Sequence, residues 1–170
     1  MRLKVLKFKS VDSTNNKAIK LIKSNKLKPT IIISTLQKNG RGRYGRKWIS
    51  IKGNLFLSIY FKIKDHSSLK FLTKKNCNLV KKSLSKFINK RILVKYPNDL
   101  LIENKKVCGI LQETIIYKKY KFLIIGIGVN LIKSPNISNY PTTYLFKFIK
   151  KKIGINLVYN VIKKNFEKSF

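Results

Sequence analysis

Arginine is concentrated in one short stretch of a chain that otherwise uses lysine. Of five arginines, three lie at positions 41, 43 and 46, between the glycines of the segment Gly40–Trp48. The planar guanidinium group binds carboxylate or phosphate through two parallel hydrogen bonds, whereas lysine is a point charge. Glycines let the backbone turn tightly and approach a ligand closely. The stretch therefore predicts a loop that folds over a small anion, with a mobile basic surface loop as the alternative.

The net charge of the chain is +33, from 39 lysines and arginines against six acidic residues. Such a charge points to nucleic acid or to an acidic membrane surface as partner. The lysines are nevertheless spread along the whole length of a chain that is also rich in asparagine and isoleucine. This distribution favours compositional bias over a nucleic-acid or membrane function. We expect salt-sensitive, non-specific binding to polyanions, but no specific DNA binding.

Length and composition indicate one domain with a buried core, because the chain has 170 residues, of which 44% are hydrophobic. Cys77 and Cys108 give neither a metal-binding spacing nor a disulfide framework. The N-terminus has no signal-peptide pattern, and no apolar run approaches about 18 residues. The sequence therefore predicts a soluble, cytoplasmic protein without a metal site of its own.

Hydrophobic periodicity predicts an α+β domain, a mixed sheet of about seven strands with helices packed against it. Strands are expected at residues 3–8, 30–36, 55–63, 92–94, 100–103, 106–114 and 122–125. Helices are expected from near Ser13 to before Pro29, and at about 72–88, 142–152 and 157–168. The segment Gly126–Leu131 is interpreted as a glycine-bulged strand, since it lacks the third glycine and the following helix of a dinucleotide-binding fingerprint.

Five short motifs follow one another along the chain. They are Ser13-Thr14-Asn15; Gln37 with the Gly40–Trp48 stretch; Lys95-Tyr96-Pro97-Asn98-Asp99; Lys106-Val107-Cys108-Gly109-Ile110-Leu111; and Gly126-Ile127-Gly128-Val129-Asn130. Their order resembles biotin protein ligase, the biotin–acetyl-CoA-carboxylase ligase, over nearly the whole chain. The resemblance implies the catalytic fold of biotin and lipoate ligases, which is similar to that of class II aminoacyl-tRNA synthetases.

The resemblance implies a two-step, ATP-dependent and AMP-forming ligation. The carboxylate of biotin attacks the α-phosphate of ATP, which gives biotinyl-AMP and pyrophosphate. A lysine of a biotin carboxyl carrier protein then takes the biotinyl group as an amide. Because two anions must meet, the site needs fixed positive charge rather than an acid/base histidine. Biotin and ATP are the implied substrates, and Mg²⁺ enters with ATP, bound mainly through the phosphates.

The site residues follow from the resemblance, position by position. Lys95 matches the active-site lysine, expected to contact both the biotin carboxylate and the α-phosphate, and Arg43 is the second implied catalytic residue. The implied biotin-binding residues are Ser13, Thr14, Asn15, Gln37, Arg41, Gly42, Arg43, Lys95, Gly109, Gly126 and Gly128. The implied ATP-binding residues are Arg43, Arg46, Lys47, Trp48, Lys95, Asn98 and Asn130.

The chain departs from the family pattern in two respects. Tyr96 stands where the family usually has tryptophan. Residues 1–170 are expected to form a single catalytic domain, with no helix-turn-helix before the first strand and no evident C-terminal β-barrel. The implied partner is the carrier protein, and the sequence leaves a homodimer open.

Two alternative functions remain open on the sequence alone. Lipoate or octanoate ligases and transferases of the same fold share the active-site lysine. Octanoyltransferases use a cysteine beside it, however, whereas Cys108 lies thirteen positions after Lys95. A non-catalytic, basic nucleic-acid-binding protein predicts an affinity that falls steeply with salt. A ligase predicts saturable biotin binding that survives moderate salt.

Overall fold

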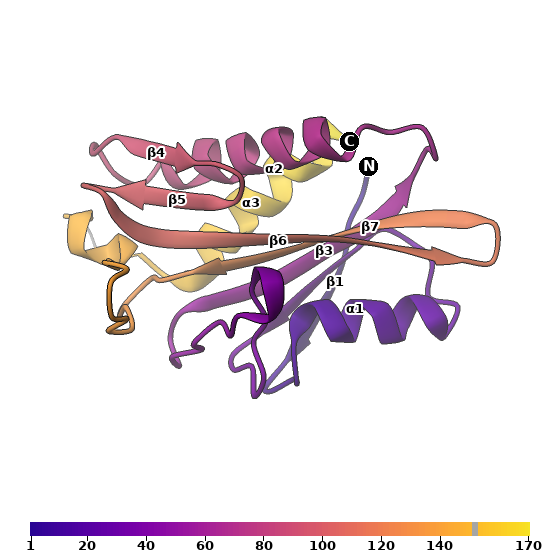
Figure 1. Ribbon diagram of the computed structural model, residues 1–170, viewed down its shortest axis with the longest axis horizontal. Helices are drawn as coiled ribbons and strands as arrows, with labels where there is room; N and C mark the ends of the chain where they lie inside the picture. Colours follow the sequence, from indigo (N-terminus) through magenta and orange to yellow (C-terminus); the bar gives the residue numbers. More distant parts are fainter. Residues whose placement is uncertain (151–152) are drawn as a thin grey trace.

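The computed structural model describes residues 1–150 and 153–170 (Figure 1). Its strands are β1 (Lys4–Phe8), β2 (Thr30–Ser34), β3 (Leu55–Ile63), β4 (Ile92–Lys95), β5 (Asp99–Ile102), β6 (Lys105–Tyr117) and β7 (Tyr120–Val129). Its helices are α1 (Thr14–Lys23), α2 (Leu69–Leu84) and α3 (Ile155–Ser169), with short 3₁₀ turns at Arg43–Gly45 and Leu145–Phe148.

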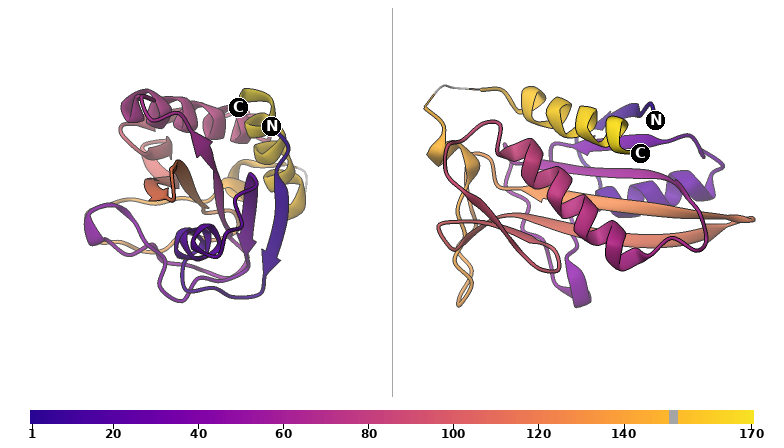
Figure 2. Two further views of the ribbon diagram at one scale, coloured as in Figure 1. Left: turned by 90° about the vertical axis from the view of Figure 1, so that its right-hand side faces the viewer. Right: turned by 90° about the horizontal axis from the view of Figure 1, so that it is seen from above.

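The seven strands of the described residues form one sheet in the order β1-β2-β3-β7-β6-β5-β4. β1 pairs with β2 in parallel, and the other neighbouring strands pair antiparallel. Helices α2 and α3 cover one face of the sheet, and α1 covers the other (Figures 1 and 2). The predicted α+β class with a mixed sheet is thereby confirmed.

The side chains of β3 alternate between the two faces of the sheet and contribute to both hydrophobic cores. Leu55, Leu57 and Ile59 belong to the larger core beneath α2 and α3, as their spacing predicts. Tyr60 faces the other way and packs with Ala18 of α1 in the smaller core. Since β3 is covered on both faces, it holds β7, which pairs with it along its whole length, in a fixed position.

The helix predicted at 142–152 is wrong in its described part, which contains only the 3₁₀ turn Leu145–Phe148; residues 151–152 lie outside the described residues. The amides of Leu145 and Phe146 donate instead to the carbonyls of Asn130 and Leu131, at 2.8 and 2.9 Å. Pairing with a distant segment therefore satisfies backbone groups that a helix would have paired locally.

Two further features differ from expectation, the bounds of a helix and the regularity of a strand. The second helix is α2, Leu69–Leu84, rather than 72–88, because the side chain of Ser68 caps it by accepting from the amide of Phe71. The expected glycine bulge is wrong, since β7 runs through Gly126 and Gly128 with no register shift toward β3 or β6. The glycines therefore leave the sheet regular and remove side chains from one of its faces.

The two ends of the described chain meet at α3 (Figure 2). Glu167 accepts a hydrogen bond from the amide of Leu3 at 2.8 Å, and Lys163 forms an ion pair with the same carboxylate at 2.8 Å. Burial raises the pKa of Glu167, but the hydrogen bonds from Leu3 and Lys163 and the charge of Lys163 lower it by more. The pKa of Glu167 therefore lies below its ordinary value.

Glu167→Gln is expected to lower the free energy of unfolding by about 1 kcal/mol at neutral pH, because the charged acceptor and its ion pair are lost. A carboxylate whose folded pKa is depressed stabilises the fold above its unfolded pKa and loses that contribution as the pH falls. The difference between variant and parent should therefore shrink below the ordinary pKa of 4.5. Urea unfolding of both proteins at pH 7 and pH 3 measures this, and a difference independent of pH would contradict it.

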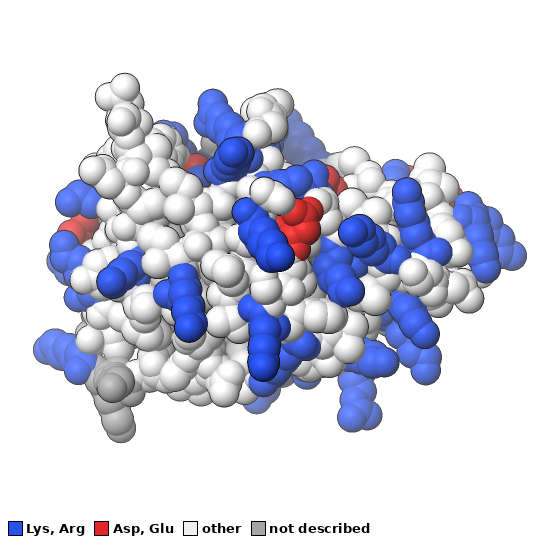
Figure 3. Space-filling model, turned by 90° about the horizontal axis from the view of Figure 1, so that it is seen from below, with Lys and Arg blue, Asp and Glu red and all other residues white. Residues whose placement is uncertain are grey.

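Lysine and arginine side chains are spread over the face seen from below, with few acidic side chains between them (Figure 3). This face thus shows the spread of charge that the sequence indicates. Among the described residues, none of the helices combines the length and apolar composition needed to cross a membrane.

Candidate active site

A cavity of about 830 Å³ lies beside the first turn of α1, on the face of the sheet that carries this helix. Its walls are the Gly40–Trp48 loop, the segment 95–99, the glycines of β6 and β7, and the loop 137–140. The volume falls within the range of small-molecule sites. The predicted site residues line this cavity, with the exception of Asn130. The side chain of Asn130 is buried outside the cavity and donates to the carbonyl of Thr143 at 3.1 Å.

One end of the cavity is neutral and rich in amide groups. Asn15, buried in the first turn of α1, accepts from Ser58 Oγ at 2.5 Å and donates to Glu113 at 2.7 Å. Gln37 Oε1 accepts from the amide of Thr14 at 2.9 Å and from its hydroxyl at 3.0 Å. These contacts fix the orientation of both carboxamides. The Ser13 cap of α1 lies beside them on the cavity wall.

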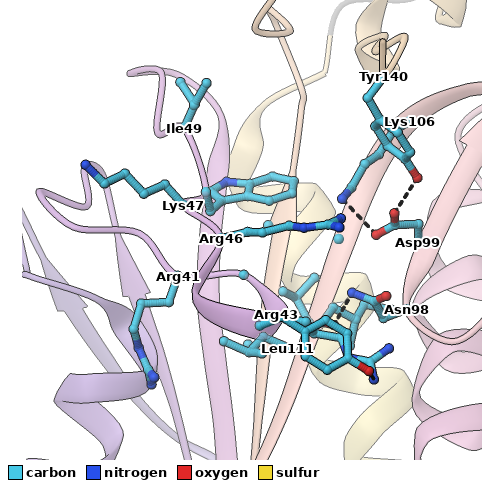
Figure 4. Close-up of a pocket in the computed structure, with 18 of the residues that line it drawn as sticks. Arg41, Arg43, Arg46, Lys47, Ile49, Asn98, Asp99, Lys106, Leu111 and Tyr140 are labelled. Carbon is cyan, nitrogen blue, oxygen red and sulfur yellow. Dashed lines mark hydrogen bonds and ion pairs between the residues drawn. The ribbon is translucent and has the colours of Figure 1, made fainter. Parts of the chain in front are cut away.

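The arginine loop is tied to this end through its first arginine. Arg41 forms an ion pair with Glu113 at 2.6 Å, on the same carboxylate oxygen that accepts from Asn15. The loop closes on itself, since the amide of Gly42 donates to the carbonyl of Arg46 at 2.7 Å. Figure 4 shows Arg41 directed away from the opposite end of the cavity, whereas Arg46 is directed toward it. Arg41 and Arg46 therefore serve different ends of the cavity, while Arg43 lies against Tyr44 and donates to its hydroxyl at 2.9 Å.

Trp48 lies over the glycines of the sheet. A Cβ atom at Gly128 would stand 2.5 Å from the indole, and one at Gly109 would stand 2.6 Å from it. Gly109 and Gly128 are cross-strand partners, so a side chain on either would displace the ring. The indole Nε1 is buried and has no hydrogen-bond partner among the described residues. Glycine at these positions is thus explained by close approach of a side chain.

The other end of the cavity is cationic. Lys106 Nζ lies 2.8 Å from Asp99 Oδ1, and its side chain is only 19% exposed. The hydroxyl of Tyr140 donates to Asp99 Oδ2 at 2.6 Å. Burial, followed by the hydrogen bond to Asp99 and the charge of Asp99, raises the pKa of Tyr140 to about 12. Figure 4 shows Arg46 reaching the same group of residues.

The remaining predicted residues lie around this end. Lys95 is exposed at the rim, with Nζ 4.9 Å from the centroid of the Tyr140 ring. Asn98 donates to the carbonyl of Ile110 at 3.2 Å, which ties the segment 95–99 to β6. Lys47 points away from the ion pair (Figure 4). The structure therefore brings Lys95 to the cavity but places Lys106 deeper within it.

The sequence profile of the Biotin/lipoate A/B protein ligase family matches residues 7–130. The chain belongs to this family. The matched region contains both ends of the cavity except the loop that carries Tyr140.

Curated members of the family are similar to the chain over part of their length. The bifunctional ligase/repressor BirA of Bacillus subtilis is 32% identical over 132 residues, which cover 74% of this chain and 40% of that protein. BirA of Escherichia coli is 33% identical over 124 residues, covering 71% of this chain and 38% of that protein. The chain thus spans well under half of the length of these two relatives.

Solved ligases share the fold over almost the whole chain. A biotin protein ligase from Aquifex aeolicus, solved in complex with biotin and ATP, has a TM-score of 0.82 and 29% identity, and the match covers 97% of this chain and 69% of that one. A bipartite lipoate protein ligase from Thermoplasma acidophilum has a TM-score of 0.67 at 11% identity, which shows the fold alone.

Three residues at the cationic end of the cavity were not among the predicted site residues: Lys106, Asp99 and Tyr140. Glu113, which pairs with Arg41 but does not line the cavity, was also missed. Lys106 and Asp99 stand inside recognised motifs, although the resemblance was taken to imply Lys95 as the active-site lysine. A signal for Asp99 exists, because the chain has only six acidic residues and a carboxylate within a motif of such a chain is a candidate for a specific partner. Glu113 and Tyr140 lie outside the five motifs and give no such signal.

Proposed function

We propose that this chain is an ATP-dependent biotin ligase, which forms biotinyl-AMP and transfers the biotinyl group to a lysine of a biotin carboxyl carrier protein. One observation carries the proposal: a single cavity joins a neutral, amide-lined end to a cationic end. Biotin has the matching division, since its ureido ring is neutral and its tail ends in a carboxylate. The similarity to the Aquifex aeolicus ligase solved with biotin and ATP supports this assignment.

The neutral end holds the ureido ring in this proposal. Asn15, Thr14 and Gln37 offer donors and acceptors for a group that both donates and accepts hydrogen bonds. Because their own hydrogen bonds fix them beforehand, little side-chain freedom is lost when the ring binds. Gly126 lets the Asn15 carboxamide lie close to the sheet, and Gly128 does the same for the Trp48 indole, so that both side chains can border the ring.

The cationic end is where the first step takes place. An oxygen of the biotin carboxylate attacks the α-phosphorus of ATP, and the bond to the bridging oxygen breaks, so that pyrophosphate leaves. Lys106 and Arg46 provide positive charge that is in place before the reaction, which stabilises the charge developing on the phosphate. We propose that Lys106 rather than Lys95 contacts the reacting groups, because Lys106 is half-buried within the cavity and Lys95 is exposed at its rim.

The rest of the cationic end serves the nucleotide in this proposal. Arg43 and Lys95 contact the phosphates, and Trp48 and Asn98 contact the nucleoside. Mg²⁺ enters bound to the phosphates of ATP, since this ion usually keeps several waters and binds through substrate phosphates. In the second step, an unprotonated lysine amine of the carrier protein attacks the acyl carbon, and AMP leaves.

Calorimetric titration with biotin, with and without MgATP, tests the proposal at moderate salt. We expect saturable binding that strengthens with nucleotide, together with biotin-dependent exchange of labelled pyrophosphate into ATP. Transfer is measured as a mass increase of a purified carrier domain. Binding of lipoate or octanoate in place of biotin would assign the chain to lipoyl chemistry. Binding of polyanions alone, lost as salt rises, would leave only the charge-based alternative.

A further inference from the structure

Tyr140 connects a loop without any recognised motif to the cationic end of the cavity. Its hydroxyl donates to Asp99 Oδ2 at 2.6 Å, while Asp99 Oδ1 pairs with Lys106 Nζ at 2.8 Å. The ring centroid of Tyr140 lies 5.4 Å from the same Nζ. The three side chains come from separate segments of the chain and converge in Figure 4. Tyr140 therefore contacts Lys106 both directly, through its ring, and indirectly, through Asp99.

We propose that Tyr140 is a positioning residue that holds the Lys106 ammonium in place for the first step, acting through Asp99. The inference rests on the proposed ligase function. It concerns a residue outside the five motifs and outside the region matched by the family profile.

The geometry explains why a second partner for Asp99 matters. The backbone of Asp99 is fixed on both sides, since it pairs with Lys95 of β4 and with Gly109 of β6. The remaining freedom lies in the side-chain torsions, and the terminal torsion of aspartate is broad. A single ion pair leaves the carboxylate free to turn, whereas an ion pair at Oδ1 together with a hydrogen bond at Oδ2 restricts its plane. The plane of Asp99 then fixes the position of Lys106.

Burial, together with the hydrogen bond to Asp99 and the charge of Asp99, keeps Tyr140 in the donor state by raising its pKa. With a pKa raised to about 12, its hydroxyl stays protonated throughout the neutral range and donates continuously to Asp99. The ring face also attracts the ammonium of Lys106. Removal of the hydroxyl alone therefore separates the effect through Asp99 from the effect of the ring.

Tyr140→Phe keeps the ring and removes the donor. We expect kcat for biotinyl-AMP formation to fall about tenfold, because a small displacement of a reacting group is costly. The Kd for biotin should stay unchanged, since the amide-lined end is not touched. Tyr144→Phe is the matched control: Tyr144 lies four positions later, does not line the cavity, and its hydroxyl has no hydrogen bond within the described residues. Its kcat should equal that of the parent.

A double-mutant cycle with Asp99→Asn decides whether Tyr140 acts through Asp99. If it does, Tyr140→Phe has little further effect on kcat once Asp99 has been replaced. Independent, multiplying effects of the two substitutions would overturn the proposal. A Tyr140→Phe variant that loses biotin affinity and kcat to the same extent would also overturn it, because that pattern indicates general damage to the site.

A measurement without substrates separates this inference from the proposed function. The acetylation rate of Lys106 by acetic anhydride is followed by peptide mass spectrometry, with the exposed neighbour Lys105 as internal reference. We expect Lys106 to react severalfold faster in Tyr140→Phe, because its ion pair is less well held. If the parent protein forms no biotinyl-AMP, the ligase proposal is wrong, but the acetylation assay can still be interpreted. If Lys106 is acetylated at the same rate in the parent and in Tyr140→Phe, the proposed role of Tyr140 is wrong.

Discussion

Lys106→Ala is expected to lower the rate of biotinyl-AMP formation by about 100- to 1,000-fold, the loss typical of removing one preorganised group that stabilises transition-state charge. The structure gives two reasons. The substitution removes the cation of the cavity that is paired at 2.8 Å with Asp99, and it leaves that carboxylate unpaired where anionic substrates must bind. Single-turnover formation of biotinyl-AMP from biotin and ATP measures the effect.

Lys105→Ala and Lys95→Ala are the controls for this experiment. Lys105 is the exposed neighbour of Lys106 on β6, so its loss tests the effect of charge alone and should leave the rate near that of the parent. Lys95→Ala should act mainly on the KM for ATP, since Lys95 lies at the rim. If Lys95→Ala abolished the reaction while Lys106→Ala did not, the two lysines would have to exchange roles.

Gly126→Ala is expected to weaken biotin binding by about 100-fold, equivalent to losing two hydrogen bonds of about 1.4 kcal/mol each. The added Cβ would lie 2.5 Å from Oδ1 and 3.0 Å from Cγ of Asn15. Asn15 has little room to move, because Ser58 and Glu113 hold both ends of its carboxamide. The crowding should also cost about 1–3 kcal/mol of stability. Calorimetric titration with biotin and thermal unfolding measure the two effects.

Gly154→Ala is the matched control for the glycine variant. Apart from its chain neighbours, no atom of the described residues lies within 4 Å of the position of its added Cβ, so the same chemical change meets no obstacle there. Its biotin affinity should equal that of the parent. Normal biotin binding by Gly126→Ala would show that the orientation of Asn15 is not needed for the ligand, and the assignment of the amide-lined end would fail.

The arginine loop could be located from the sequence because the concentration of arginine in Gly40–Trp48 stands out against a lysine-rich background. This signal does not depend on the rest of the fold. The glycines were located in another way, through their place in motifs that resemble a known family. Their physical reason is a long-range contact, since only glycine tolerates the Asn15 carboxamide or the Trp48 indole at the distances found for Gly126 and Gly128.

The choice between lysines could not be made in the same way. Lys95 ends β4 and Lys106 lies near the start of β6, and each lysine precedes a motif asparagine or glycine by three residues. Which lysine is less exposed depends on the pairing of β5 with both strands and on the position of the Tyr140 loop. These are long-range contacts, which residue spacing does not specify. Asn130 was misplaced for a related reason, since Thr143 takes its side chain away from the cavity.

The wrong prediction of a helix at 142–152 has a comparable origin in its described part. Leu145 is fully buried, and its amide donates to the carbonyl of Asn130. The apolar residues that suggest a helix by their spacing therefore pack a segment of the chain back against the sheet. By contrast, the strands at 3–8 and 55–63 were predicted well. Residues 3–8 alternate between lysine and apolar residues along an edge strand, and residues 55–63 carry apolar side chains on a strand that is covered on both faces.

The positive charge spread over the surface has a consequence for the timing of turnover. A field of one sign attracts ATP from every direction and speeds its capture at low ionic strength. The same field retards the departure of pyrophosphate and AMP, which are also anions. Added salt weakens both effects through screening. Turnover should therefore pass through a maximum as salt rises, limited by departure of products on one side and by capture of ATP on the other.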